Sequence, residues 1–150
     1  EIEKLAEKTD EILKASYPIK GMDFSFSGLV TEMQRKIGQE TNEIIANTFQ
    51  ETAYGICVEA LERAMAQENS EEALLTGGVA MNSRLREMIT QMCEDRGAKA
   101  YFPPAEYCMD NGAMIAHQGL IELKTGRKTT LEDSGKKPDW RPDQIKVDWL

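Results

Sequence analysis

The sequence predicts an α/β fold that is rich in helices and carries an incomplete sheet. Two short apolar segments, residues 73–76 and 98–102, read as strands, and each is followed by a break and a segment with helical periodicity. The order strand, Gly-Gly turn, helix, strand, helix is typical of α/β proteins. Only two or three strands can be recognised, so we expect the sheet to continue into sequence outside this chain.

Residues 1–16 predict an amphipathic helix that ends before Pro18. Its apolar stripe consists of Ile2, Leu5, Ala6, Ile12 and Leu13. The next segment, residues 21–28, alternates Phe and Ser, which indicates a short strand or an extended loop with Phe24 and Phe26 in the core. A helix then begins near Ser27 or Gly28 and runs through Ile37.

The middle of the chain predicts the longest helical segment. Apolar residues recur at helical spacing over residues 40–67, as one helix or two, and Asn69 and Ser70 break the pattern. After the buried strand and the Gly-Gly turn, Asn82 or Ser83 is a suitable N-cap for another helix, and Gly97 supplies its left-handed stop.

The last third of the chain predicts one more helix and a polar arm. Residues 109–123 are apolar and helical, with Gly126 as the stop, and residues 124–142 form an irregular surface arm. The final six residues alternate, as in a last strand or a segment that packs only against a partner. We expect four methionines to fill the core of the predicted helices: Met88, Met92, Met109 and Met114.

The composition indicates an ordinary globular protein. The chain has 150 residues, 41% of them hydrophobic, and 18 Lys and Arg residues against 26 Asp and Glu residues give a net charge of −8. This length suits one domain with a core of its own, and no apolar run reaches the roughly 18 residues of a membrane span. Because affinity for a phosphate backbone comes mostly from Lys and Arg, the acidic balance argues against nucleic-acid binding by this segment alone.

The start of the chain and its cysteines bear on the length of the polypeptide and on its cellular compartment. Glu1 already lies in a helical pattern and no signal peptide follows, so we expect a piece of a longer polypeptide with sequence removed upstream. Cys57, Cys93 and Cys108 are odd in number and widely spaced. They indicate neither a disulfide framework nor a Cys-rich zinc site, and they favour a reducing, cytoplasmic location.

The first candidate site is T-G-G-V-A-M-N at residues 76–82, between a predicted strand and a helix. Glycines at Gly77 and Gly78 allow a ligand to approach the backbone, and the N-terminus of the next helix offers free N–H groups to phosphate or ribose oxygens. The motif lacks the dinucleotide fingerprint G-x-G-x-x-G. A nucleotide site and a plain turn capped by Asn82 therefore both remain open.

The second candidate is Asp110, near the start of the predicted helix 109–123. A carboxylate there can cap the helix and interact with its dipole, or it can bind a divalent cation together with ligands from elsewhere. His117 is the only histidine, which excludes an H-E-x-x-H protease motif and leaves a packed or solvated residue as its simplest role. No catalytic residue can be assigned from the sequence.

Five strings follow one another in the order and spacing of a known family. They are E-I-E-K-L-A at the start, K-G-M-D-F-S-F-S-G-L at 20–29, F-Q-E-T-A-Y at 49–54, L-T-G-G-V-A-M-N-S-R-L-R-E-M at 75–88 and Y-C-M-D-N-G-A-M-I-A at 107–116. Over nearly its whole length the chain resembles the tRNA threonylcarbamoyladenosine biosynthesis transferase family, which includes the KEOPS catalytic subunit and was formerly described as an O-sialoglycoprotein endopeptidase. The tail W-R-P-D-Q-I-K-V-D-W is similar to the archaeal and eukaryotic type.

The resemblance implies both a fold and an activity. The family has the two-lobe actin-like ATPase fold shared with sugar kinases and heat-shock proteins, so the chain would be the C-terminal portion, lacking an N-terminal lobe. The implied reaction transfers a threonylcarbamoyl group from threonylcarbamoyl-adenylate to N6 of the adenosine adjacent to the tRNA anticodon. The implied partners are tRNA, the KEOPS kinase subunit and the other KEOPS subunits, with no membrane.

The resemblance also assigns roles to individual residues. Asn82, Gly77 and Gly78 match family positions that contact or line the nucleotide, which is ATP or threonylcarbamoyl-adenylate. Glu3 matches the Glu of a G-G-P-x-I-E string near the ribose, although the glycines before it are missing. Asp110 matches a ligand of one divalent metal ion, which could be iron, zinc or magnesium. The family's H-x-x-x-H ligands are absent, so this chain would hold only part of the metal site and would be inactive alone.

These implications divide the chain into regions and leave a second function open. Residues 1–70 would form a helical insertion region, residues 71–123 the nucleotide-binding α/β core, and residues 124–150 the C-terminal arm. The alternative is a non-catalytic docking module for the KEOPS kinase subunit, with the arm and its two Trp residues as the surface. The arm could equally fold back on its own lobe. The D-N-G and S-F-S-G strings disfavour a sugar or acetate kinase.

Overall fold

The computed structural model describes residues 1–141, 144, 145 and 147, and it divides the chain into two units. The first unit is Glu1–Cys108 and the second is Met109–Leu150, and each is described separately. The strand predicted for the final six residues falls largely outside the described residues.

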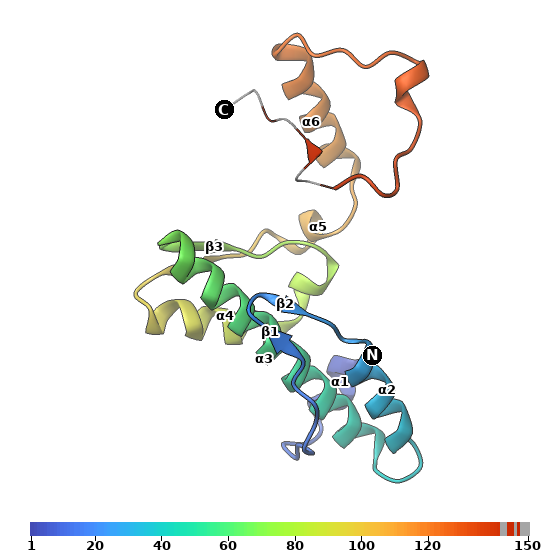
Figure 1. Cartoon of the computed structure of the whole chain (residues 1–150), viewed down its shortest axis with the longest axis vertical. Coiled ribbons are helices and arrows are strands. Elements are labelled where there is room, and N and C mark those ends of the chain that lie inside the picture. The colour runs from blue at the N-terminus through green and yellow to red at the C-terminus, as the bar shows by residue number, and fades with distance from the viewer. Residues whose placement is uncertain (142–143, 146, 148–150) are drawn as a thin grey trace. The chain divides into compact units, whose positions relative to one another are not determined.

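A single long helix, α3 (Asn42–Glu68), organises the first unit (Figure 1). Thr41 caps its start, where the Thr41 hydroxyl accepts a hydrogen bond from the backbone N–H of Ile44 at 3.3 Å. Asn69 ends it in the left-handed conformation with φ 51°, a conformation that Asn tolerates better than most residues. The segment predicted as one helix or two is therefore one helix, and α1, α2 and α4 all pack against it.

The first helix is much shorter than the sequence predicts, because α1 spans only Ile2–Ala6. The chain beyond it is held to α3 by backbone groups that a continuing helix would have used internally. The N–H of Leu13 donates to the Thr48 hydroxyl at 3.0 Å, and Asn47 Nδ2 donates to the carbonyl of Glu11 at 3.1 Å. These contacts with α3 replace the predicted second half of the helix.

The predicted strand after Pro18 is a small antiparallel hairpin of β1 (Ile19–Lys20) and β2 (Asp23–Phe24). Gly21 lies in its turn with φ 65°. The two Phe rings lie near each other, with centroids 5.1 Å apart. Phe26 packs against the core, but Phe24 is 42% exposed, so the prediction that both rings are buried is wrong for Phe24.

Helix α2 (Ser27–Lys36) begins where the sequence predicts. Leu29 and Met33 lie on one face of it, and they form a buried cluster with Ala53 of α3. The spacing of four residues between Leu29 and Met33 places both on the same side of the helix. This cluster is the smaller of two cores in the first unit.

The larger core lies beneath a two-stranded parallel sheet. Strand β3 (Glu72–Leu74) pairs with β4 (Lys99–Tyr101), and α4 (Ser83–Asp95) makes the crossover between them. Gly97 follows α4 with φ 69°, as predicted. The buried residues of this core come from α3, β3 and α4: Met65, Ala73, Leu85, Ile89, Met92 and Cys93.

The prediction that the first strand is buried is only partly right. Ala73 is buried, but Leu74, whose side chain points to the opposite face of the strand, is 69% exposed. The short helix η1 (Gly78–Met81) between β3 and α4 was also not predicted.

The second unit contains α6 (Gly112–Lys124). Asn111 caps it by accepting a hydrogen bond from the N–H of Met114 at 2.9 Å, so the helix begins after Asp110, and Asp110 is not its N-cap. No residue of α6 is buried, and Met109 and Met114 are 57% and 46% exposed. The predicted core role of these two methionines is therefore wrong, whereas Met92 of α4 is buried as expected.

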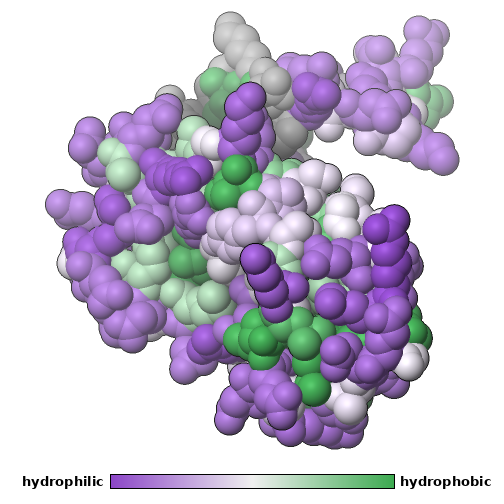
Figure 2. Space-filling model, turned by 60° about the horizontal axis from the view of Figure 1, so that its bottom comes forward, coloured by the Kyte–Doolittle hydropathy of each residue, from purple (hydrophilic) through white to green (hydrophobic). Residues whose placement is uncertain are grey.

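Beyond α6 the chain is irregular, as the sequence predicts. Gly126 follows the helix with φ 76°, and the arm includes a short helical turn, η2 (Glu132–Ser134). The face of the molecule in Figure 2 is largely hydrophilic, with its most hydrophobic groups gathered in a patch near the bottom of the view. None of the described helices combines the length and hydrophobicity that a membrane crossing needs. The thiols of Cys57, Cys93 and Cys108 are free.

Candidate functional site

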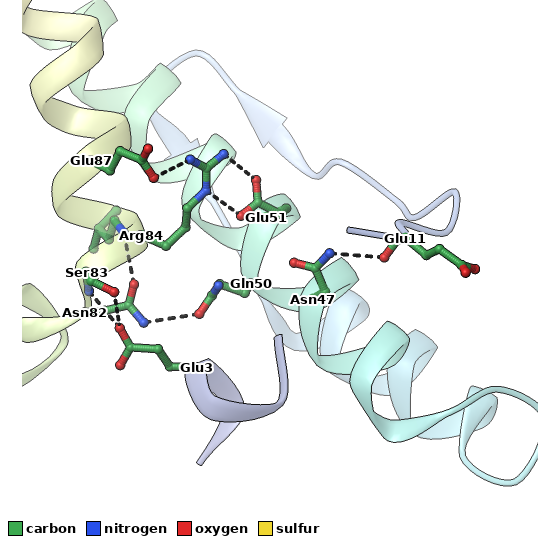
Figure 3. Close-up of polar contacts among 10 residues, drawn as sticks. Glu3, Glu11, Asn47, Gln50, Glu51, Asn82, Ser83, Arg84 and Glu87 are labelled. Carbon is green, nitrogen blue, oxygen red and sulfur yellow. Dashed lines mark hydrogen bonds and ion pairs between the residues drawn. The ribbon is translucent and has the colours of Figure 1, made fainter. Parts of the chain in front are cut away.

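Three consecutive residues at the start of α4 each bind a different group of the first unit (Figure 3). Asn82 and Arg84 reach α3, and Ser83 reaches α1. The glycine turn at residues 77 and 78 leads directly into this point through η1. Two of the predicted nucleotide residues, Glu3 and Asn82, thus lie where α1, α3 and α4 meet.

Asn82 is a buried cap with both ends of its amide engaged. Its Oδ1 accepts a hydrogen bond from the N–H of Leu85 at 2.9 Å, which satisfies one of the free donors at the helix start. Its Nδ2 donates to Oε1 of Gln50 at 3.2 Å. Gln50 is also buried, so the pair forms a polar contact inside the packing between α3 and α4.

Ser83 brings Glu3 to the same helix end. Glu3 Oε1 accepts hydrogen bonds from the Ser83 N–H at 2.8 Å and from the Ser83 hydroxyl at 2.7 Å. These two hydrogen bonds, first the one from the hydroxyl, lower the pKa of the Glu3 carboxyl. The carboxylate therefore stays ionised at neutral pH, at the positive end of the helix dipole.

These contacts change how the helix end can be used. The sequence predicts free N–H groups for a phosphate, but Glu3 and the Asn82 side chain already accept from Ser83 and Leu85. A negative carboxylate at this position also repels a phosphate. These two N–H groups are thus less available to a phosphate than the sequence suggests, whereas ribose hydroxyls are compatible with Glu3 as an acceptor.

Arg84 joins α4 to α3 through charge. Its guanidinium binds Glu51 through two nitrogens, at 2.7 Å and 2.9 Å, and Glu87 of its own helix at 2.6 Å. Hydrogen bonds to Glu51 and then to Glu87 raise the pKa of Arg84. The side chain is 40% exposed and Glu51 is 18% exposed, so the pair lies at the edge of the helix contact.

The glycine turn is open. Gly77 has φ 94°, which favours glycine over any residue with a Cβ, and a Cβ added at Gly77 or Gly78 would meet no atom within 4 Å. Ala80 of η1 is buried, and its carbonyl accepts a hydrogen bond from Arg86 Nε. Arg86 thus binds the backbone next to the turn at Ala80, while the space beside Gly77 and Gly78 is open.

A hollow of about 710 Å³ adjoins this helix junction. Ser83 and Arg84 line it together with Gln50 and Glu51 of α3 and residues of the segment that follows α1. Gly77 and Gly78 are not among its lining residues. The predicted nucleotide residues therefore divide between the accessible turn and the packed junction beside this hollow.

Asp110 belongs to the second unit, where it is exposed and precedes the capping residue Asn111. Within the described ranges, which omit 142–143, 146 and 148–150, no three His, Cys, Asp or Glu side chains gather closely enough to hold a metal ion. His117 is exposed on α6. One carboxylate does not fit a metal by itself, because divalent ions need several ligands.

Sequence reasoning missed the residues that support the site. Gln50, Glu51 and Arg84 lie in the strings used for the resemblance, but nothing in a single sequence says which of them pair. Arg86 was missed as well, although it binds the carbonyl of Ala80 and lies 5.2 Å from the centre of the Phe102 ring. Of the predicted residues, the structure brings Glu3 and Asn82 to the start of α4, with Gly77 and Gly78 five and four residues before Asn82.

The family model described as tRNA N6-adenosine threonylcarbamoyltransferase, TsaD, matches residues 1–117. The chain belongs to this family. The proteins it matches include the tRNA N6-adenosine threonylcarbamoyltransferase of Archaeoglobus fulgidus, which is 50% identical over 149 residues, and that of Thermococcus kodakarensis, which is 48% identical over 150 residues. In both cases the alignment covers 99% of this chain and 46% of the relative. The chain thus spans about half the length of these relatives.

A further relative is a probable bifunctional tRNA threonylcarbamoyladenosine biosynthesis protein of Methanosarcina mazei, which is 45% identical over 99% of this chain and 27% of its own length. Among solved structures, HypF of T. kodakarensis superposes with a TM-score of 0.65 over 83% of this chain and 16% of HypF, at 21% identity. This similarity concerns the fold alone. It fits the prediction of an α/β chain that is rich in helices and has small sheets.

Proposed function

We propose that this chain is the C-terminal portion of an enzyme that transfers a threonylcarbamoyl group from threonylcarbamoyl-adenylate to N6 of the adenosine adjacent to the tRNA anticodon. Membership of the family and identities of 45–50% to proteins named for this activity or its pathway support the proposal. We further propose that the chain corresponds to the C-terminal lobe of an actin-like ATPase fold and works in the cytoplasm as part of a KEOPS complex.

The observation that carries the proposal is the junction of Glu3, Ser83 and Asn82 beside an open glycine turn. Glu3 Oε2 accepts no hydrogen bond from the described residues, so it can accept one from a ribose hydroxyl. The turn at Gly77 and Gly78 has no side chain that would keep a nucleotide from the backbone. These residues would bind and orient ATP or the adenylate donor.

The role that we propose for this chain in the reaction is to position the activated donor. Holding an activated donor in a reactive geometry lowers the entropic part of the barrier, and this needs fixed donors and acceptors rather than a nucleophile. Asp110 would supply one oxygen ligand to a divalent ion, whether iron, zinc or magnesium, whose role is to polarise the acyl donor. The other ligands would come from outside the described residues.

A comparison of this chain with the full-length protein tests the proposal. We expect the 150 residues alone to bind ATP and a divalent metal only weakly and to transfer nothing to tRNA, because one carboxylate and half of a cleft are incomplete sites. The full-length protein should bind both tightly and be active with its partners. Calorimetric titration with ATP and with each metal measures the difference, and stoichiometric, tight metal uptake by the 150 residues would contradict it.

A second proposed role is docking of the KEOPS kinase subunit on the second unit. Apolar residues of α6 and of the arm are exposed, among them Ile115 at 67%, Leu123 at 68% and Trp140 at 52%. A high density of exposed apolar side chains is typical of surfaces that a partner covers.

A further inference from the structure

Consecutive residues of α3 contact residues at the start of α4 through side-chain hydrogen bonds. In F-Q-E-T-A-Y, Gln50 accepts from Asn82 Nδ2 at 3.2 Å, and the next residue, Glu51, binds Arg84 at 2.7 Å and 2.9 Å. Both partners belong to the segment N-S-R at the start of α4 (Figure 3). The proposed function uses Asn82 but gives no role to the α3 residues that hold it.

We propose that Gln50 is a positioning residue of the nucleotide site. Its Oε1 fixes the amide of Asn82 and, through Asn82, the backbone that runs from Gly77 into α4. This inference rests on the proposed function, because it assigns to the same site the residue that keeps it in shape.

The two ends of the Asn82 amide explain why an acceptor on α3 is needed. Its Oδ1 caps α4 through Leu85, which fixes only one end of the group. Its Nδ2 is buried with the rest of the side chain and finds its acceptor in Gln50. Without that oxygen the Nδ2 donor has no partner at this point, and an unpaired buried donor drives the side chain toward another rotamer.

A change at Asn82 reaches the glycine turn through the backbone. Asn82 ends η1 as well as starting α4, and its N–H donates to the carbonyl of Val79 at 3.0 Å. The carbonyl of Gly77 accepts from the N–H of Ala80 at 2.9 Å, so the turn between them is a single hydrogen-bonded unit. Moving Asn82 therefore shifts the backbone that faces the proposed nucleotide.

A neighbouring side chain offers a matched control. Asn47 is an equally buried amide on α3, one turn before Gln50, but it donates to the carbonyl of Glu11 and does not contact Asn82. Replacing either amide removes one side-chain hydrogen bond between α3 and another segment. Only the change at Gln50 alters the proposed nucleotide site.

The test uses the full-length protein with residues numbered as in this chain. Gln50→Met keeps the length of the side chain and removes the acceptor, so we expect the KM for the adenylate donor and the Kd for ATP to rise about tenfold, with kcat within about twofold. Gln50→Glu retains an acceptor oxygen but buries a charge, so it should bind more tightly than Gln50→Met and less tightly than the wild type. Asn47→Leu should leave both constants unchanged.

Three results separate the possible failures. Equal effects of Gln50→Met and Asn47→Leu, or no effect of Gln50→Met, would overturn the positioning role while leaving the proposed function intact. A wild-type protein that neither binds ATP nor transfers the group would overturn both. If Gln50→Met does not fold, side-chain amide exchange in the wild type decides: the Asn82 Nδ2 protons should exchange more slowly than those of Gln50 Nε2, and equal rates contradict the proposal.

Discussion

Glu3 shows how one side chain can define the chemistry of a helix end. It lies at the N-terminus of α4 and accepts both hydrogen bonds that Ser83 can donate there. A negative charge at this end of a helix is favourable. The same charge makes the position suitable for hydroxyl donors and unsuitable for phosphates, so the negative groups of a nucleotide would lie away from Glu3.

The lowered pKa of Glu3 predicts a pH-dependent contribution to stability. A carboxyl whose folded pKa is below its ordinary value of 4.5 stabilises the fold above pH 4.5 and loses this effect as the pH falls through the folded value. We expect Glu3→Gln to lower the free energy of unfolding slightly at pH 7 and not at pH 3. The effect is small because the group is largely solvated.

Urea denaturation at both pH values measures this difference. Glu7→Gln is the control, because Glu7 follows the same helix and its carboxylate forms no hydrogen bond or ion pair with the rest of the described chain. A wild type and a Glu3→Gln variant that lose stability in parallel on acidification would show that the Ser83 contact contributes nothing.

Among the secondary-structure elements, the joint between α3 and α4 carries the candidate site, and a bidentate ion pair closes it. Glu51 and Arg84 share two hydrogen bonds with good geometry, which distinguishes them from most surface pairs. Arg96 and Glu62 join the same two helices further along, but through one contact at 3.5 Å. The two pairs allow a comparison within one helix contact.

A double-mutant cycle tests the difference between these pairs. For Glu51→Gln and Arg84→Met we expect a coupling energy of about 1 kcal/mol in unfolding experiments, since both side chains are partly exposed. For Glu62→Gln and Arg96→Met we expect less than about 0.5 kcal/mol. Equal coupling in the two cycles would mean that bidentate geometry does not strengthen this joint.

The elements also show what could be predicted from the sequence and what could not. Helices with local signals were predicted well: α2 starts at Ser27, α3 ends at Asn69, and Asn82 and Gly97 bound α4. Their capping residues act within a few positions along the chain. The early end of α1 could not be predicted, because it depends on hydrogen bonds to α3 from segments more than 30 residues away.

The candidate site divides in the same way. Gly77, Gly78 and Asn82 could be predicted because a turn and a cap are local features. Gln50 could not, since its role depends on Asn82, which is 32 positions away. Glu3 was assigned only through the resemblance, and the structure adds its contact with Ser83.

For the whole molecule, apolar surface is unevenly distributed between the units. Both buried clusters lie within Glu1–Cys108, whereas α6 in the second unit buries none of its residues. Leu131, in the arm, is 90% exposed. The curated relatives are about twice as long as this chain, so parts of this surface can be covered in the longer protein or by a partner.

Deletion of the arm decides between a docking surface and a tail that folds back. We expect the full-length protein without residues 136–150 to bind the kinase subunit at least about tenfold more weakly, because the apolar contact of Trp140 is lost. Trp140→Ala should reproduce most of this loss. Leu74→Ala is the control, since Leu74 is 69% exposed but lies on β3 of the first unit, outside the proposed docking surface. Titration calorimetry measures the affinity for the kinase. If the affinity stays unchanged on deletion, the arm packs on its own protein and the proposed docking role is wrong.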